Sequence, residues 1–484
     1  MDRENNFGRL LALLLIALGI SFGMYYLPEE VFGWEIKKVD LLSDLREEAP
    51  KVSLDSLRNQ LKEPDTLEVD SAALRDSIIR LAEIDSAALA LRDSLYNVMH
   101  SVRGADSLGK HIEDYSPGHV GLKRFFAALN NVNNMNRPVR IAFMGDSFIE
   151  GDIVVADLRS ALQKMFGGRG VGFVPIMSVA AQYRPTIEQH SDGWLTWSIL
   201  TDHEEQGYTL SGMVFEPEKD KKATASLKTT DRYPELKEAS SLKFIYERST
   251  ATSMDLCCNG EADTLHAQLP PSEGVTQYEL KGRFTEASFS FTASEGLKAL
   301  GVAMEDETGV VVDNYSLRGN SGLVLNHLDS VSCRQLSEIR PYDLIILQYG
   351  LNVANDSILQ YGWYTKQMVD VVHHLRGCFP DSDVLLLGVS DRSRQENGEF
   401  ETMPAVLALL HAQRQIARKE GIPFWNTFGA MGGENSMVRF VENNWASKDY
   451  THLSFRGGRE IATALFEALL REKEFYDEAD KTIQ

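Results

Sequence analysis

Residues 139–147 read Val-Arg-Ile-Ala-Phe-Met-Gly-Asp-Ser, and this stretch decides the fold. Its first six residues are mostly apolar and stand between Pro138 and Gly145, a pattern that predicts a short buried strand. Apolar residues then recur at helical spacing over 153–166, which predicts a helix. We therefore expect Ser147 in the turn between strand and helix, near a helix N-terminus whose free N–H groups favour negative charge.

Three further segments, far apart in the chain, carry residue types that serve acyl transfer. They are Asn320-Ser321-Gly322, Gly350-Leu351-Asn352 and Asp449-Tyr450-Thr451-His452. A serine hydroxyl is a poor nucleophile at neutral pH unless an imidazole takes its proton and a carboxylate orients that imidazole. Ser147, His452 and Asp449 are the candidate nucleophile, base and orienting carboxylate.

A negative charge that develops on a substrate oxygen requires preorganised hydrogen-bond donors. The candidate donors are the backbone N–H groups of Ser147 and Gly322 and the side-chain amide of Asn352, with Gly319 as the alternative to Gly322. A strand predicted over 343–347 ends just before Asn352. Open α/β sheets bind ligands outside the carboxyl ends of their strands, so this position suits the role.

The flanks of the other segments also predict regular structure. Strand-like runs at 299–304 and 310–312 precede the second segment, and a helix is expected over 323–339. Apolar residues at helical spacing after the last segment predict a closing helix over 453–470. Strands that alternate with helices in this way predict an α/β fold.

Taken in order, the four segments resemble the sequence blocks of the SGNH (GDSL) hydrolase superfamily. These blocks are Gly-Asp-Ser with an aspartate five residues after the serine, then a glycine, then Gly-x-Asn, then Asp-x-x-His near the C-terminus. Asp152 stands five residues after Ser147, and Asp146 and Gly350 belong to the blocks as supporting residues. Val353 departs from the pattern, since many members carry an acidic residue there, and leaves the subfamily open.

The resemblance covers 119–177 and 309–472. It implies a three-layer α/β/α catalytic domain with a mainly parallel sheet, formed by 119–177 and 309–484, that needs neither metal nor organic cofactor. No Gly-x-Ser-x-Gly elbow occurs, which argues against the α/β-hydrolase fold. His-Glu-x-x-His is absent from the eleven histidines and the adjacent pair His373-His374 diverges on a helix, so no metal site is expected.

Helical periodicity largely disappears over 178–308, where short β-prone runs alternate with turns. The runs are 195–200, 208–215, 223–227, 242–246, 277–280 and 287–292. They predict an inserted β-sandwich, and its position resembles that of the carbohydrate-module-like domain of bacterial peptidoglycan O-acetylesterases. Trp194 and Trp197 could offer aromatic faces to sugar rings, but buried tryptophans are the favoured interpretation.

An uncharged run of eighteen residues, 10–27, reaches the lower limit of bilayer-spanning length. Arg3 and Arg9 precede it, and no small-residue cleavage site closes it. We expect 1–27 to be a cytoplasmic tip and an uncleaved signal anchor, with a cleaved signal peptide as the alternative. The rest of the chain would then lie outside the cytoplasm, in the periplasm of a Gram-negative bacterium.

Residues 28–118 are acidic, rich in Ser, Leu and Ala, and poor in aromatic residues. The sequence Asp-Ser-Ala-Ala-Leu at 70–74 recurs at 85–89, an offset of about four helical turns. We expect a helical stalk over 68–100 that holds the catalytic domain off the membrane and could self-associate. A weakly ordered linker is equally compatible with this composition.

The composition excludes some partners. The chain carries 49 basic and 70 acidic residues, a formal net charge of −21, whereas nucleic-acid binding needs a positive footprint. The four cysteines are too few for a disulfide framework and are expected to be structural; they are Cys257, Cys258, Cys333 and Cys378. The glycine-rich run 167–172 lacks Gly-Lys-Ser/Thr and is interpreted as a turn.

These observations predict a membrane-anchored serine esterase that removes acyl groups, O-acetyl groups in particular, from a cell-wall or other extracytoplasmic glycan. An O-acyltransferase that uses the same acyl-enzyme, with a glycan hydroxyl in place of water, is the first alternative. A catalytically inactive glycan-binding scaffold is the second.

Overall fold

The computed structural model describes residues 109–483 except 203–206, 251, 261–262 and 293. It also describes residues 30–31, 34–35, 89–90, 92–93 and 96. The chain divides into two units, Met1–Ile78 and Ile79–Gln484. The described residues of the first unit form an antiparallel pair of short strands, β1 (Glu30–Val31) and β2 (Trp34–Glu35). The predicted anchor over 10–27 and most of the predicted stalk lie outside the described residues. In the described part, no helix combines the length and the apolar character that a membrane span requires.

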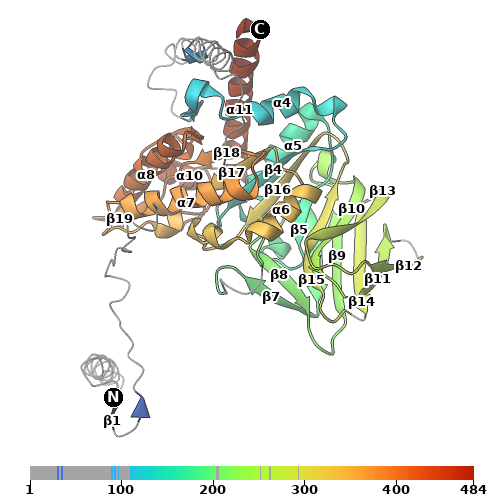
Figure 1. Ribbon diagram of the computed structural model, residues 1–484. Helices are drawn as coiled ribbons and strands as arrows, with labels where there is room; N and C mark the ends of the chain where they lie inside the picture. Colours follow the sequence, from blue (N-terminus) through green and yellow to red (C-terminus); the bar gives the residue numbers. More distant parts are fainter. Residues whose placement is uncertain are drawn as a thin grey trace, which may run out of the picture. The chain divides into compact units, whose positions relative to one another are not determined.

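A six-stranded sheet forms the centre of the second unit (Figure 1). Its strand order is β16 (Val310–Ser316), β4 (Val139–Gly145), β17 (Leu344–Gln348), β18 (Asp383–Leu387), β21 (Pro423–Trp425) and β3 (Ile112–Asp114). The first five strands run parallel, and β3 pairs antiparallel with β21. All residues of β4 and β17 are buried, which explains their nearly continuous apolar sequences. The predicted α/β class with a mainly parallel sheet is confirmed.

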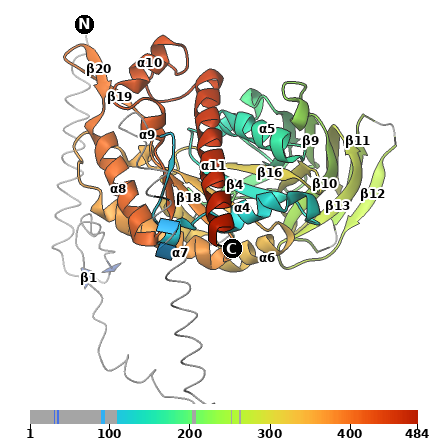
Figure 2. The same ribbon diagram turned by 90° about the horizontal axis from the view of Figure 1, so that it is seen from above.

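Helices cover both faces of this sheet (Figures 1 and 2). One set comprises α4 (Lys123–Asn130), α5 (Val155–Phe166) and α11 (Phe455–Ile483). The other comprises α6 (Ser330–Ile339), α7 (Gly362–Cys378) and α8 (Pro404–Glu420). Ile141 and Phe143 of β4 pack with the first set, whereas Ala142 and Met144 pack with the second, so the layers are α/β/α. Two short helices after β21 complete the domain, α9 (Thr427–Ala430) and α10 (Ser436–Glu442).

Residues 172–305 form a β-sandwich. One sheet has the order β12 (Leu265–Leu269), β11 (Thr252–Cys258), β14 (Glu286–Thr292), β9 (Ala223–Thr229) and β6 (Ile187–Asp192). The other has the order β13 (Thr276–Phe284), β10 (Ala239–Arg248), β15 (Lys298–Glu305), β8 (Met213–Pro217) and β7 (Trp194–Ser198), and β5 (Gly172–Pro175) pairs with β15. Aromatic rings meet between the sheets, with the centroids of Phe244 and Phe289 5.7 Å apart. β5 joins this sandwich although the sequence placed 119–177 in the catalytic domain.

The helix after the first motif starts later than its sequence predicts. α5 begins at Val155, and a 3-10 turn, η5 (Glu150–Asp152), stands between it and Ser147. The expectation that Ser147 lies at a helix N-terminus is therefore wrong, because Gly151 and Asp152 have positive φ angles that interrupt helical geometry.

Two further predicted elements have different bounds. The helix expected over 323–339 is broken into η8 (Leu323–His327) and α6, because Asp329 caps α6 by accepting a hydrogen bond from Ser332 N at 2.7 Å. The strand expected over 208–215 is β8, which begins only at Met213. The closing helix, α11, runs on to Ile483.

The C-terminal end of the predicted stalk packs against the catalytic unit. Ile112 of β3 is fully buried. Tyr96 Oη donates to Ile112 O at 3.2 Å, and the Tyr96 ring stacks on His119 with the centroids 3.5 Å apart. Arg92 forms an ion pair with Asp480 of α11 at 3.7 Å. These residues belong to the folded unit rather than to a projecting stalk, and self-association through the stalk stays a prediction.

Residues interpreted as structural occupy the interior. Trp194 is buried, and its indole Nε1 donates to Thr224 O at 2.8 Å. Cys333 and Cys378 are also buried, and none of the four cysteines, all of which the structure describes, forms a disulfide. Trp194 therefore offers no ring face to a sugar.

A buried ionic cluster joins the sandwich to the central sheet. Glu305, at the end of β15, is fully buried. Its carboxylate accepts hydrogen bonds from Arg140 Nη2 at 2.7 Å, Lys243 Nζ at 2.8 Å and Arg340 Nη2 at 2.8 Å. Burial alone would raise the pKa of Glu305, but these three cations hold it well below its usual range. Because Arg140 lies in β4 and Lys243 in β10, the cluster fixes the two domains to each other.

Glu305→Ala is expected to lower the free energy of unfolding by about 3–5 kcal/mol, because it leaves buried cations without their partner. Urea denaturation followed by circular dichroism measures this loss. Glu307→Ala is the matched control, since Glu307 pairs with Lys281 at the surface and such pairs contribute about 1 kcal/mol or less. Equal losses in the two variants would contradict the prediction.

Candidate active site

Ser147, His452 and Asp449 converge at the carboxyl edge of the central sheet. Ser147 follows the end of β4, and the other two residues lie in the loop before α11. Ser147 Oγ lies 3.1 Å from His452 Nε2, and His452 Nδ1 lies 2.8 Å from Asp449 Oδ2. These distances fit a hydrogen-bonded nucleophile, base and orienting carboxylate. The structure thus brings together the three residues that the sequence selected, across 305 positions of the chain.

A tight loop fixes the orientation of the Asp449 carboxylate. Its Oδ1 accepts hydrogen bonds from Ser447 Oγ at 2.7 Å, Thr451 N at 2.9 Å and His452 N at 3.0 Å. Burial would raise the pKa of Asp449, but these hydrogen bonds and the one from the His452 ring hold it well below its usual range. The ionised Oδ2 therefore keeps the imidazole proton on Nδ1 and leaves Nε2 free to accept the proton of Ser147.

A hairpin that the sequence did not predict supports this loop. It consists of β19 (Ser393–Glu396) and β20 (Glu399–Thr402). Ser393 N donates to Tyr450 O at 3.1 Å, and the Phe400 ring stacks on the Tyr450 ring with the centroids 3.6 Å apart. Tyr450 has a φ of 53°, in the left-handed region that non-glycine residues rarely adopt. The hairpin contacts offset this strain and hold the catalytic loop in its conformation.

Asp146 positions the side chain of Asn352 beside the nucleophile. Asn352 Nδ2 donates to Asp146 Oδ2 and to Asn320 O, both at 2.9 Å. Asp146 Oδ1 in turn accepts a hydrogen bond from Phe148 N at 2.9 Å. Asp146 is 2% exposed, and this burial raises its pKa to about 6. Protonation of Asp146 in mildly acidic solution would therefore weaken the hold on the Asn352 amide.

Of the three proposed oxyanion donors, Ser147 N has no acceptor within the described residues, whereas the Asn352 amide and the Gly322 N–H already have acceptors. Ser147 N has no hydrogen-bond partner within the described residues, and Ser147 and Asn352 line the same pocket. Gly322 is buried, and its N–H donates to Asn320 Oδ1 at 2.7 Å, so this group is already occupied. Gly319 is exposed, and its N–H makes no hydrogen bond in the described part of the chain. Of the two glycines, Gly319 is therefore the one whose N–H is free to donate, and neither glycine lines the pocket.

Asp152 ties the loop that follows Ser147 to its surroundings. It is fully buried and has a φ of 65°. Its carboxylate lies 3.1 Å from Arg159 Nη1 and 2.9 Å from Arg184 Nε, and it accepts a hydrogen bond from Asn314 Nδ2 at 2.8 Å. Burial alone would raise the pKa of Asp152, but the two guanidinium groups hold it well below its usual range. Its role is structural, because it contacts β16 and the sandwich rather than the catalytic pocket.

Gly350 provides the turn that presents Asn352. Its φ is 126°, and an added Cβ would lie 2.7 Å from Val389 Cγ1 and 2.9 Å from Gln413 Nε2. Both the conformation and the space therefore require glycine at this position.

A pocket of about 360 Å³ lies over these groups. It is lined by Asp146, Ser147, Phe148, Leu351, Asn352, Arg392, Asp449, Thr451 and His452. Sequence reasoning missed Arg392, which is half-buried and whose guanidinium makes no hydrogen bond or ion pair within the described residues. Arg392 follows β18, the neighbour of β17, so the strand-end argument that selected Asn352 also points to this loop.

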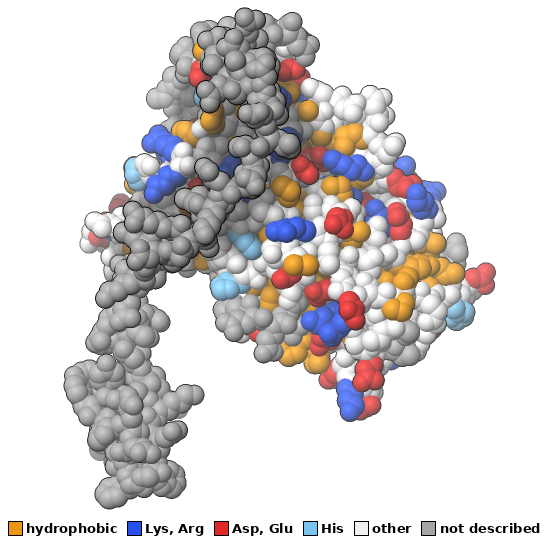
Figure 3. Space-filling view, viewed as in Figure 1, with side chains coloured by type: hydrophobic (Ala, Val, Ile, Leu, Met, Phe, Trp, Pro, Cys, Tyr) orange, Lys and Arg blue, Asp and Glu red, His pale blue; other side chains and the backbone are white. Residues whose placement is uncertain are grey.

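The described residues contain no group of three or more His, Cys, Asp or Glu side chains that could hold a metal ion. His374 Nε2 lies 2.8 Å from Leu328 O, and His373 pairs with Glu420 at 2.9 Å. Figure 3 shows acidic and basic side chains interspersed over one face of the molecule.

The raised pKa of Asp146 predicts an unusually steep fall of kcat/KM on the acid side of the pH profile. Asp146 must be ionised to hold the Asn352 amide, so its protonation below pH about 6 is expected to steepen the fall of log(kcat/KM) with decreasing pH by one. Asp146→Asn removes this titration and is expected to lower the slope by one. It also lowers kcat by about tenfold at neutral pH, because its amide opposes that of Asn352. The same slope in both proteins would contradict this role.

Comparison with known proteins supports the fold. The chain matches no protein-family model and no curated protein sequence. A solved structure of a peptidoglycan O-acetylesterase superposes with a TM-score of 0.60 at 21% sequence identity, over 75% of this chain and 99% of that one. The chain has the SGNH hydrolase fold. Because few residues are identical, the SGNH similarity establishes architecture, and the chemistry follows from the site geometry.

Two other solved structures match with lower TM-scores. A family two carbohydrate esterase from Cellvibrio japonicus has 10% identity and a TM-score of 0.26, over 60% of this chain and 99% of that one. A salicylyl-acyltransferase from a tetracycline biosynthetic pathway has 14% identity and a TM-score of 0.28, over 60% of this chain and 96% of that one.

Proposed function

We propose that this protein is a serine esterase that hydrolyses O-acyl esters, O-acetyl esters in particular, on an extracytoplasmic glycan such as peptidoglycan. The continuous hydrogen-bond chain from Ser147 through His452 to Asp449 carries the proposal. The fold shared with a peptidoglycan O-acetylesterase over 99% of that protein supports an acetylated glycan as the substrate class.

In the proposed reaction, Ser147 Oγ attacks the ester carbonyl carbon while His452 Nε2 takes its proton. The N–H groups of Ser147 and Gly319 bind the oxyanion together with the Asn352 amide, which exchanges one of its present acceptors for the substrate oxygen. Collapse of the tetrahedral intermediate breaks the ester bond, and His452 protonates the departing glycan hydroxyl. Water, deprotonated by His452, then attacks the acyl-enzyme. Collapse of this second intermediate breaks the bond to Ser147 Oγ, His452 returns the proton to that oxygen, and the carboxylic acid is released.

The pocket composition favours a carbohydrate ester over a lipid. The guanidinium of Arg392 has no partner in the described part of the protein, and a long aliphatic chain in the pocket would desolvate it without compensation. A glycan supplies hydroxyl and carbonyl oxygens that accept hydrogen bonds from this group.

The proposed cellular location rests on the sequence. The uncharged run 10–27, with Arg3 and Arg9 ahead of it, would anchor the protein in a membrane and leave the catalytic unit outside the cytoplasm. Such a location would give the enzyme access to an envelope glycan.

Mass spectrometry tests the proposed chemistry directly. After brief exposure to p-nitrophenyl acetate, the peptide that contains Ser147 is expected to carry one acetyl group. Release of free acetate from O-acetylated peptidoglycan or acetylated xylan would establish hydrolysis. Transfer of the acetyl group to an added glycan, without free acetate, would establish the acyltransferase instead. Absence of both the adduct and turnover would overturn the esterase proposal.

A further inference from the structure

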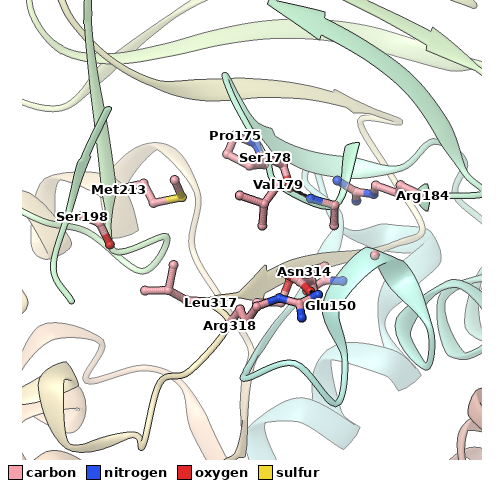
Figure 4. A pocket seen from close by; sticks show the side chains of 13 residues that line it. Glu150, Pro175, Ser178, Val179, Arg184, Ser198, Met213, Asn314, Leu317 and Arg318 are labelled. Atoms are coloured by element: carbon pink, nitrogen blue, oxygen red, sulfur yellow. Dashed lines mark hydrogen bonds and ion pairs between the residues drawn. The ribbon is translucent and has the colours of Figure 1, made fainter. Parts of the chain in front are cut away.

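A second pocket, which we call the junction pocket, lies where the sandwich meets the catalytic domain (Figure 4). Its volume is about 350 Å³. Ser198 and Met213 lie on one side of it and Arg184 on the opposite side, with Val179 above and Arg318 below. Both domains therefore contribute walls to this pocket.

The junction pocket is close to the nucleophile along the edge of the central sheet. Ser316, one of its lining residues, pairs with Gly145 in the ladder of β16 and β4. The next residue, Leu317, donates its N–H to Gly145 O at 2.9 Å. Glu150 lines the pocket three positions after Ser147. A substrate whose ester lies at Ser147 can therefore extend across the end of β16 into the junction pocket.

The lining combines polar groups with aliphatic surface. Glu150 and Arg318 form an ion pair, in which the Arg318 side chain is 64% exposed and can offer further N–H donors. Ser198 adds a hydroxyl group, while Val179, which is 76% exposed, and Met213 provide aliphatic walls. Sugar rings present hydroxyl groups at their edges and C–H groups on their faces. A few polar groups among apolar walls suit such a ligand.

The walls are held in place before any ligand binds. Arg184 Nε lies 2.9 Å from Asp152 Oδ2, and Asn314 Nδ2 donates to Asp152 Oδ1 at 2.8 Å. Arg184 Nη2 and Asn314 Oδ1 are buried without a partner in the described part of the chain, so one donor and one acceptor of the lining residues are unused. A preorganised pocket loses little conformational entropy on binding.

We propose that the junction pocket is a saccharide subsite that binds the sugar next to the one carrying the ester, on the same glycan chain. The inference rests on the proposed esterase function, which it deepens by assigning a subsite. An acetyl group is too small to fill this volume, and a longer acyl chain would meet the Glu150–Arg318 ion pair. A sugar residue satisfies both the polar and the aliphatic walls.

Met213→Trp, which fills the pocket, tests the subsite through a ratio of activities. The kcat/KM for O-acetylated peptidoglycan, divided by that for p-nitrophenyl acetate, is expected to fall at least about tenfold. Met165→Trp is the matched control, because Met165 is 53% exposed on α5 and does not line the pocket, and its ratio should stay unchanged. An unchanged ratio in Met213→Trp, with p-nitrophenyl acetate still hydrolysed, would overturn the subsite and leave the esterase proposal standing.

A binding measurement tests the same subsite without turnover. Calorimetric titration of the Ser147→Ala protein with chitotetraose and with xylotetraose is expected to show binding of at least one of them. Adding Met213→Trp should weaken that binding at least about tenfold. Absence of binding to both oligosaccharides, or equal affinity in the two proteins, would overturn the subsite even if the esterase proves active.

Discussion

Ser147→Ala is expected to lower kcat for p-nitrophenyl acetate by about 10⁴- to 10⁶-fold, because it removes the oxygen that forms the acyl-enzyme. Among the described residues, Ser147 Oγ is the hydroxyl bonded to His452 Nε2, at 3.1 Å. The residual rate would come from the oxyanion donors and from binding alone.

The fold should not change in this variant, because Ser147 is half-buried and its Oγ makes no other hydrogen bond in the described structure. The free energy of unfolding is therefore expected to stay within about 0.5 kcal/mol of that of the unmodified protein. Ser160→Ala is the matched control: Ser160 Oγ donates to Glu235 Oε2 at 2.7 Å on α5, away from the site, and its loss should leave kcat unchanged. Retention of a tenth or more of the activity by Ser147→Ala would refute the role of this serine.

The catalytic side chains could be predicted because short sequence motifs contain the residue types that the chemistry requires. Asp449 and His452 stand three residues apart, so a single loop can bring Oδ2 to Nδ1 without any knowledge of the remaining fold. The central strands could also be predicted, because β4 and β17 are buried on both faces and are therefore nearly continuous apolar runs.

The choice between the two candidate oxyanion glycines depends on whether the Asn320 side chain closes a turn onto Gly322 N. Gly319 and Gly322 stand in the same short segment, and both have positive φ angles of 81° and 91°. The choice between them is made by Asn320, whose Oδ1 takes the Gly322 N–H while its backbone carbonyl accepts from Asn352. The folded loop shows which of the two glycines keeps an N–H without an acceptor.

Exposed strands were missed for a related reason. β12 keeps one buried residue, Leu269, and β20 has no buried residue, so neither shows the apolar alternation that identifies a strand. The hairpin of β19 and β20 is instead held by tertiary contacts, chiefly the stacking of Phe400 on Tyr450. A sequence pattern identifies a strand through its buried apolar residues. These strands are formed by pairing with a neighbouring strand and bury almost no side chains.

Asp449→Asn is expected to lower kcat by about 10⁴-fold at neutral pH, although it changes one atom of a half-exposed side chain. Three donors converge on Asp449 Oδ1, so the amide oxygen of the asparagine must stay at that position. The NH₂ group then faces His452 Nδ1 and donates to it. The imidazole proton is forced onto Nε2, which can no longer accept the proton of Ser147.

A second exposed His–Asp pair in the same chain separates this tautomer effect from a general effect of the substitution. On the sandwich, His266 Nδ1 lies 2.7 Å from Asp255 Oδ1, a distance close to that of the catalytic pair. Asp255→Asn alters the same kind of contact far from the nucleophile and should leave kcat unchanged. The kcat values of the two variants for p-nitrophenyl acetate distinguish the tautomer effect from a general effect of the substitution. If Asp449→Asn retains the rate of Asp255→Asn, the Asp449 carboxylate does not set the tautomer of His452, and the base must be oriented by other contacts.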